Sequence, residues 1–246
     1  MKDDLRAETI RISGHGGDQI KAYLAQPVDE GSFPGVLVIH HMPGWDESTK
    51  EITRRFAANG YIGICPSLHH REGPDASPDD AAAAARAKGG VPDERFLADA
   101  AGAIAHVRSL PTSNGKVGVI GYCSGGRQSF LAACTLDVNA AVDCYGAFVI
   151  GSPPENMGLK FTPVIDRARD MRCPLLGLFG AEDKYPTVEE VGQIEAELKR
   201  LGKTHEFHVF DGAGHAFFSP DRPSYRQAAA TEGWKLIFEW FGRYLA

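Results

Sequence analysis

The sequence predicts one α/β domain over residues 1–246, with a mostly parallel, twisted sheet and helices on both of its faces. Short apolar runs alternate along the chain with longer segments of helical periodicity. Most of these runs lack strict two-residue alternation, which is typical of strands that are covered on both faces. Two alternating segments near the start are joined by a glycine-rich turn, and they predict an antiparallel hairpin at the edge of the sheet.

The expected hairpin pairs Thr9–Ser13 with Gln19–Pro27. Six further strands are expected at 35–40, 61–65, 116–120, 140–145, 174–179 and 205–210. Helices are expected between them and at the end of the chain, at 48–59, 93–109, 125–136, 187–201 and 225–244. Ser48 with Glu51 predicts a capping box for the first helix, and Thr187 is the expected cap of the fourth.

Two stretches, 66–91 and 148–172, do not fit this alternation. The first contains a run of alanines, and the second is rich in proline, glycine and charge. Strands of the same pattern continue on both sides of each stretch, so neither is expected to link two domains. Long insertions in a compact domain are often functional.

Composition narrows the possible classes of function. The chain has 26 basic and 32 acidic residues and a net charge of −6, so a nucleic-acid partner is not expected. No apolar run approaches the roughly 20 residues that cross a bilayer. The charged N-terminus, Met1–Arg6, does not resemble a signal peptide. The five cysteines, at 65, 123, 134, 144 and 173, form no CxxC pair and predict reduced thiols in the cytoplasm.

The segment Gly121–Gly126, GYCSGG, directly follows an expected strand and precedes an expected helix. This is the pattern of a nucleophile elbow, with Cys123 where serine is usual. The glycines permit a tight turn, and the helix N-terminus favours a thiolate. The alternative is a buried cysteine beside a glycine-rich turn. We expect Cys123 to be the nucleophile.

A general base and an acid follow the nucleophile in the chain. His215 lies in a glycine-rich loop after the strand at 205–210, where it could reach across to Cys123. Asp183 follows the strand at 174–179 and could orient His215, although Glu182 and Asp211 are rival acids. The order of nucleophile, acid and histidine is that of α/β-hydrolases.

The elbow, preceded by SNGKVG at 113–118, resembles the dienelactone hydrolase (carboxymethylenebutenolidase) family from about Gln19 to the last helix. The resemblance implies an α/β-hydrolase fold without cofactor, either a monomer or a weak homo-oligomer. It also implies that the chain hydrolyses a small-molecule ester or lactone through an acyl-enzyme on Cys123, with Asp183 and His215 completing a triad.

The same resemblance implies further roles. The backbone N–H groups of Met42 and Ser124 would form the oxyanion hole, and Arg71 matches an arginine that binds the substrate carboxylate. A second family arginine is replaced by Ser219, and the family's glutamate before the oxyanion residue is replaced by His41. If His41 faces the pocket, it should lower the thiol pKa. Otherwise Asp46 or Glu47 takes the glutamate's place.

The remaining histidines and aromatic residues are assigned to the substrate pocket. His41, Trp45 and Tyr122 are expected to contact substrate. The pairs His40–His41 and His69–His70 raise the possibility of a metal site together with His215. Adjacent strand residues point in opposite directions, and no acidic or cysteine ligand has suitable spacing, so no metal is expected.

The sequence therefore predicts a dienelactone hydrolase-like ester or lactone hydrolase with no nucleic-acid or membrane partner. One alternative is a broad-specificity carboxylesterase that uses the same triad. A second is a non-catalytic, ligand-binding relic of the fold, which would have been free to lose parts of the triad.

Overall fold

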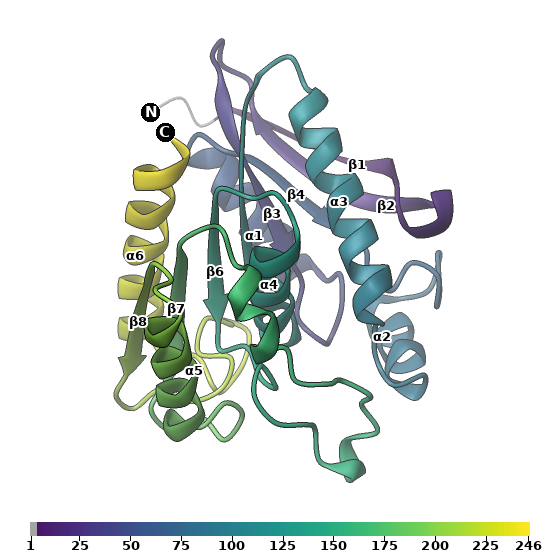
Figure 1. Cartoon of the computed structure of the whole chain (residues 1–246). Coiled ribbons are helices and arrows are strands. Elements are labelled where there is room, and N and C mark those ends of the chain that lie inside the picture. The colour runs from purple at the N-terminus through teal and green to yellow at the C-terminus, as the bar shows by residue number, and fades with distance from the viewer. Residues whose placement is uncertain (1–3) are drawn as a thin grey trace.

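The computed structural model describes residues 4–246 (Figure 1). Residues 1–3, which belong to the N-terminus considered above for a signal peptide, lie outside the described part. Eight strands form one sheet in the order β1-β2-β4-β3-β5-β6-β7-β8. Strand β2 pairs antiparallel with both β1 and β4, and the other neighbours are parallel. The strands are β1 (Leu5–Ser13), β2 (Gln19–Pro27), β3 (Phe33–Ile39), β4 (Ile62–Pro66), β5 (Ser113–Tyr122), β6 (Ala140–Cys144), β7 (Leu175–Gly180) and β8 (His205–Phe210).

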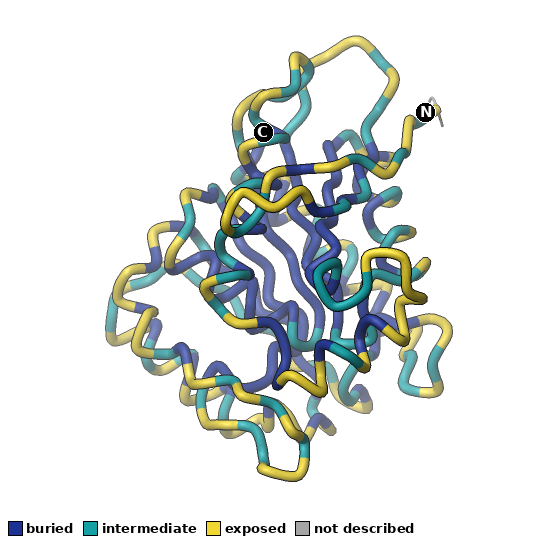
Figure 2. Tube along the Cα trace, turned by 90° about the vertical axis from the view of Figure 1, so that its right-hand side faces the viewer, coloured by how far each residue is buried: buried dark blue, intermediate teal, exposed yellow. Residues whose placement is uncertain are grey.

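The helices cover both faces of the sheet, as the sequence predicts. Helices α3, α4 and α5 pack on one face, and α1 and α6 pack on the other. The sheet strands form the buried centre of Figure 2, with exposed loops around them. The helices are α1 (Glu47–Ala58), α2 (Pro78–Ala87), α3 (Asp93–Ser109), α4 (Ser124–Thr135), α5 (Val188–Arg200) and α6 (Gln227–Leu245). The predicted α/β-hydrolase architecture with an antiparallel edge pair is confirmed.

Local capping explains several of the helix boundaries. Thr187 caps α5 in a capping box with Glu190, which confirms it as the cap. The capping box predicted for α1 is wrong, because the Asp46 side chain accepts the Thr49 N–H at 2.9 Å and the helix begins one residue earlier. Helix α2 was not predicted. This helix contains the alanine run and is capped by Ser77.

The parallel part of the sheet positions the candidate site. Strands β3, β5, β7 and β8 run in the same direction, so their carboxyl ends lie at one edge of the sheet. Met42, Cys123, Asp183 and His215 each follow one of these ends. In open α/β sheets, this edge is where ligands bind. Among residues 4–246, no helix is long and apolar enough to span a membrane.

Candidate active site

Cys123 lies in a strained turn between β5 and α4. Its φ of 58° and ψ of −119° are unusual for a residue with a side chain. The flanking glycines make this turn possible, because a Cβ at Gly125 would lie only 2.5 Å from the Ile39 carbonyl oxygen. A Cβ at Gly121 would collide with the Gly125 carbonyl. The observed backbone is that of a nucleophile elbow.

His215 and Asp183 form a hydrogen-bonded pair beside the elbow. The distance from His215 Nδ1 to Asp183 Oδ2 is 2.8 Å, and Asp183 Oδ1 accepts the Tyr185 N–H at 2.9 Å. A carboxylate can only accept, so Nδ1 carries the proton and Nε2 is left to face the thiol of Cys123. Burial lowers the pKa of His215, but the hydrogen bonds to Asp183 and Cys123 outweigh it and raise the pKa to about 10.

The thiol of Cys123 is surrounded by donors. Burial raises its pKa, but the contact with His215 and the backbone N–H groups of Ser124 and Met42 together bring the pKa below the usual value. The two N–H groups expected to form an oxyanion hole therefore point at the sulfur. This arrangement can stabilise a thiolate before attack and an oxyanion after it.

A cavity of about 490 Å³ opens at this point. The five predicted residues, Met42, Cys123, Ser124, Asp183 and His215, all line it. Most of the rest of its wall is apolar and includes residues of the 148–172 insertion. These additional lining residues are Ala147, Phe148, Met157, Leu159, Phe161, Glu182, Lys184 and Tyr185.

Three side chains predicted to contact substrate do not line this cavity. The His41 ring pairs through Nε2 with Asp46 Oδ2 at 2.6 Å. Tyr122 is 4 % exposed and packs on Tyr145 at a ring distance of 6.3 Å. Trp45 donates Nε1–H to the Cys65 carbonyl at 3.0 Å. His41 and Tyr122 line a separate small cavity, and Trp45 lines another cavity beside β4.

Neither acid proposed to replace the family glutamate reaches the thiol. Asp46 is bound to His41 and caps α1. Glu47 is directed to Arg54, with an oxygen–nitrogen distance of 2.6 Å. Among the described residues that line the 490 Å³ cavity, the acidic side chains are Glu182 and Asp183.

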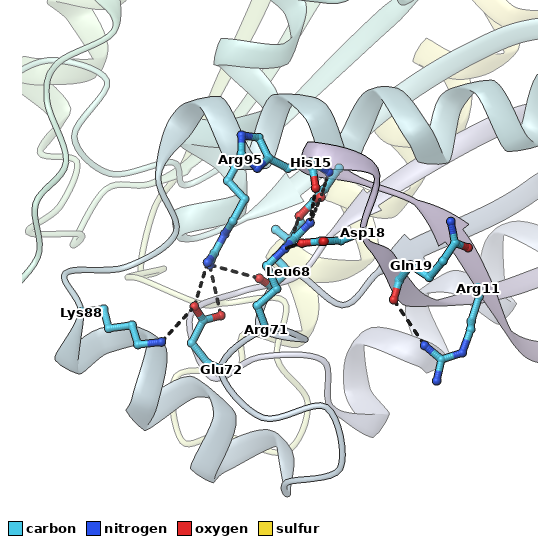
Figure 3. A network of polar contacts seen from close by, with 10 residues as sticks. Arg11, His15, Asp18, Gln19, Leu68, Arg71, Glu72, Lys88 and Arg95 are labelled. Atoms are coloured by element: carbon cyan, nitrogen blue, oxygen red, sulfur yellow. Dashed lines mark hydrogen bonds and ion pairs between the residues drawn. The ribbon is translucent and has the colours of Figure 1, made fainter.

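The prediction that Arg71 binds a substrate carboxylate is not supported, because its guanidinium is already bound by protein carboxylates (Figure 3). Nη1 and Nη2 donate to the two Asp99 oxygens at 2.8 and 2.9 Å, and Nε donates to Asp18 at 2.7 Å. Asp99 has no exposed side-chain surface. The ion pairs fasten the turn after β4 to α3 and the hairpin, and Arg71 does not line the cavity.

The histidine pairs do not form a metal site. His40 accepts the Leu68 N–H at Nε2 and is within 2.8 Å of the His41 carbonyl at Nδ1, so both of its ring nitrogens are engaged. His69 packs edge-on against His40 with ring centroids 4.7 Å apart. Across residues 4–246, no group of three or more histidine, cysteine or acidic side chains is arranged to bind a metal ion.

Sequence reasoning missed Tyr145 and the apolar wall of the cavity. The Tyr145 ring packs edge-on against His215, at a centroid distance of 5.1 Å, and so helps to orient the imidazole. Tyr145 follows an apolar strand and carried no distinguishing signal. The wall did have a signal, because Phe148, Leu159 and Phe161 are bulky apolar residues in a stretch otherwise rich in proline, glycine and charge.

Comparison with known proteins identifies the family. Residues 20–245 match the dienelactone hydrolase family. A Salmonella typhimurium protein named "Putative carboxymethylenebutenolidase" is 35% identical over 93% of this chain and 84% of its own. A Synechocystis protein of the same name is 32% identical over 98% of each chain. The crystal structure titled "Putative Dienelactone Hydrolase from Klebsiella pneumoniae" superposes with a TM-score of 0.85 at 30% identity, covering 98% of this chain and all of that one. The chain belongs to the dienelactone hydrolase family of hydrolases.

Proposed function

We propose that this protein hydrolyses a carboxylic ester or lactone through a thioester formed on Cys123. The observation that carries the proposal is the position of Cys123 in the cavity, where His215 and two backbone N–H groups, those of Ser124 and Met42, interact with its sulfur. A nucleophile, a base and an oxyanion site around one point are what acyl transfer requires.

The proposed reaction has two steps. The Cys123 thiolate attacks the carbonyl carbon, and the N–H groups of Met42 and Ser124 bind the oxyanion. His215 gives its Nε2 proton to the departing alkoxide, which leaves as an alcohol, or remains attached if the substrate is a lactone. His215 then takes a proton from water, which attacks the thioester and releases the acid and the thiolate. Asp183 keeps the imidazole oriented throughout.

The test is to trap the thioester. Wild-type protein mixed with an activated aryl ester and quenched in acid should gain the mass of the acyl group on the peptide that contains Cys123. Cys123→Ala should neither gain this mass nor release the aryl alcohol above background. Hydrolysis that survives Cys123→Ala would exclude the mechanism, and wild-type protein that turns over no ester would favour the non-catalytic alternative.

Two further proposals concern the whole chain. We propose that it is a single domain, since all eight strands described between residues 4 and 246 belong to one sheet. We also propose a cytoplasmic location, which is supported by the five cysteines, all of them in the described part of the chain and all free.

A further inference from the structure

The cavity has an apolar wall and carries its charge at the mouth. Of its charged lining residues other than the paired Asp183 and His215, Glu182 and Lys184 are exposed and carry opposite charges. The wall consists of Phe148, Met157, Leu159 and Phe161 from the insertion, together with Ala147 and Tyr185. Apart from His215, which is paired with Asp183, no buried cation is present among the described residues that line the cavity.

Two arginines that could bind a substrate carboxylate, Arg71 and Arg226, are committed to other partners. Arg71 is bound by Asp18 and Asp99, as described above. Arg226 donates to three backbone carbonyls, including those of Gly212 and Pro223 at 3.0 Å each. Ser219, at the position of the second family arginine, lines the separate small cavity beside His41. No guanidinium in the described chain lines the active-site cavity.

Arg127 is buried and does not line the cavity, but its side chain contacts residues of the apolar wall and the insertion. Its Nη1 and Nη2 donate to the two carboxylate oxygens of Asp93 at 2.7 and 2.9 Å, and Nη2 also donates to the Thr162 carbonyl at 2.7 Å. Its guanidinium lies 5.2 Å from the ring centroid of Phe161. The helix that begins beside the nucleophile is thereby tied to the insertion.

Three further contacts fix the wall in place. The Lys160 N–H donates to the Gly89 carbonyl at 2.9 Å. The Phe161 ring packs so closely on Gly90 that a Cβ there would lie 2.7 Å from it. The Phe148 and Tyr185 rings contact each other, with centroids 5.5 Å apart. The apolar wall is therefore anchored to α4 and to the turn between α2 and α3.

We infer that the active site selects uncharged esters whose acyl group is apolar and discriminates against acyl groups that carry a free carboxylate. This inference rests on the proposed function and adds its substrate class. A carboxylate against this wall would lose its hydration and gain no charge partner, which is strongly unfavourable. An alkyl or aryl group of the same shape would gain free energy from the burial of apolar surface.

A matched pair of substrates tests the inference. The para-nitrophenyl monoesters of isocaproic acid and succinic acid have acyl chains of similar shape, but the second carries a carboxylate in place of an isopropyl group. We expect kcat/KM to be about 100-fold or more higher for the isocaproyl ester, in line with the cost of burying an unpaired charge. Equal values, or a preference for the succinyl ester, would overturn the inference.

A designed variant tests the cause of the selectivity. Leu159→Arg places a cation on the wall and should raise kcat/KM for the succinyl ester at least about tenfold, since a charge-assisted pair then forms. Asn156→Arg adds the same charge to an exposed position of the same segment, outside the lining, and should leave the ratio unchanged. If Asn156→Arg has the same effect as Leu159→Arg, general electrostatic attraction explains the preference and the inference fails.

The two proposals fail in different ways. If neither ester acylates Cys123, the proposed function is wrong. If both esters acylate Cys123 and the succinyl ester reacts as fast or faster, the mechanism stands and only the substrate class is wrong. Thioester trapping on the wild-type protein with each ester separates these outcomes.

Discussion

The sequence predicts that Arg71 binds substrate, whereas the structure predicts that Arg71 stabilises the fold. The substitution Arg71→Met distinguishes these two roles. The substitution keeps the apolar stem and removes the guanidinium. Asp99, whose side chain has no exposed surface, then loses both guanidinium hydrogen bonds, at 2.8 and 2.9 Å. It retains the His15 N–H at 2.8 Å. Breaking a buried ion pair by removing one partner costs about 3–5 kcal/mol.

The assay combines unfolding with kinetics. In urea, Arg71→Met should lower the free energy of unfolding by about 3–5 kcal/mol. For a chain of this size, that corresponds to a fall in Tm of about 10 °C. Below the unfolding transition, kcat/KM for neutral and carboxylated esters should stay within about twofold of wild type, because Arg71 does not line the cavity.

Two controls sharpen this test. Arg11→Met removes an exposed guanidinium that bonds only weakly to the Gln19 carbonyl, at 3.3 Å, and should change stability little. Removing both partners in Arg71→Met with Asp99→Leu should cost less than the sum of the single changes. The structural role is refuted if Arg71→Met leaves stability intact and selectively raises KM for carboxylated esters.

Three further predictions concern acidic groups and the nucleophile. Asp183→Asn should lower kcat by several orders of magnitude, whereas the exposed Asp211→Asn should have little effect, with both melting curves recorded as controls. Burial raises the pKa of Asp143 to about 7, so the free energy of unfolding of the wild-type protein should fall as pH rises from about 4 to about 7. Asp143→Asn removes the buried charge, so it should raise Tm at pH 8 and leave Tm nearly unchanged at pH 4. Iodoacetamide should alkylate Cys123 well below the usual thiol pKa, and His41→Gln should not change this profile.

Periodicity in the sequence was enough to predict the architecture. Apart from the half-buried edge strand β8, the strands of the parallel sheet are mainly apolar runs, as expected for strands covered on both faces. All six parallel strands lie within a few residues of the predicted positions. Helix α2 was missed because its alanine run lies in an otherwise irregular stretch with no periodic apolar face. The sequence predicts Ser48 as the cap of α1, but the structure has Asp46 in that role. Both residues carry side-chain oxygens that can cap a helix, and local sequence does not decide which of them accepts a free N–H.

The elbow and the Asp183–His215 pair of the candidate site were predictable, whereas the partners of Arg71 and His41 were not. The close approaches at Gly121 and Gly125 require glycine, so the elbow is encoded locally. Whether Arg71 faces substrate depends on Asp99, which lies in α3, far from Arg71 in the sequence. The apolar wall depends on how a loop without regular structure folds back, and no period in the sequence specifies that.

The groups that stabilise a thiolate at Cys123 differ between the sequence prediction and the structure. The sequence pointed to His41 as the group that would stabilise the thiolate. In the structure, the donors at the sulfur are His215 and the N–H groups of Met42 and Ser124. His41 is turned to a different carboxylate and lines a different cavity. A thiolate is still expected, but the pKa of the Cys123 thiol should depend on His215 and not on His41.

Alkylation across pH distinguishes these partners. Because His215 has a pKa of about 10, it remains protonated through neutral pH, and the thiolate keeps its charge partner there. The rate should therefore rise with pH well below pH 8 and reach a plateau. His215→Gln removes that charge and should move the midpoint up toward the ordinary thiol value near 8.5. A wild-type midpoint already near 8.5, or one that shifts in His41→Gln and stays fixed in His215→Gln, would show that the assignment of the thiolate's partner is wrong.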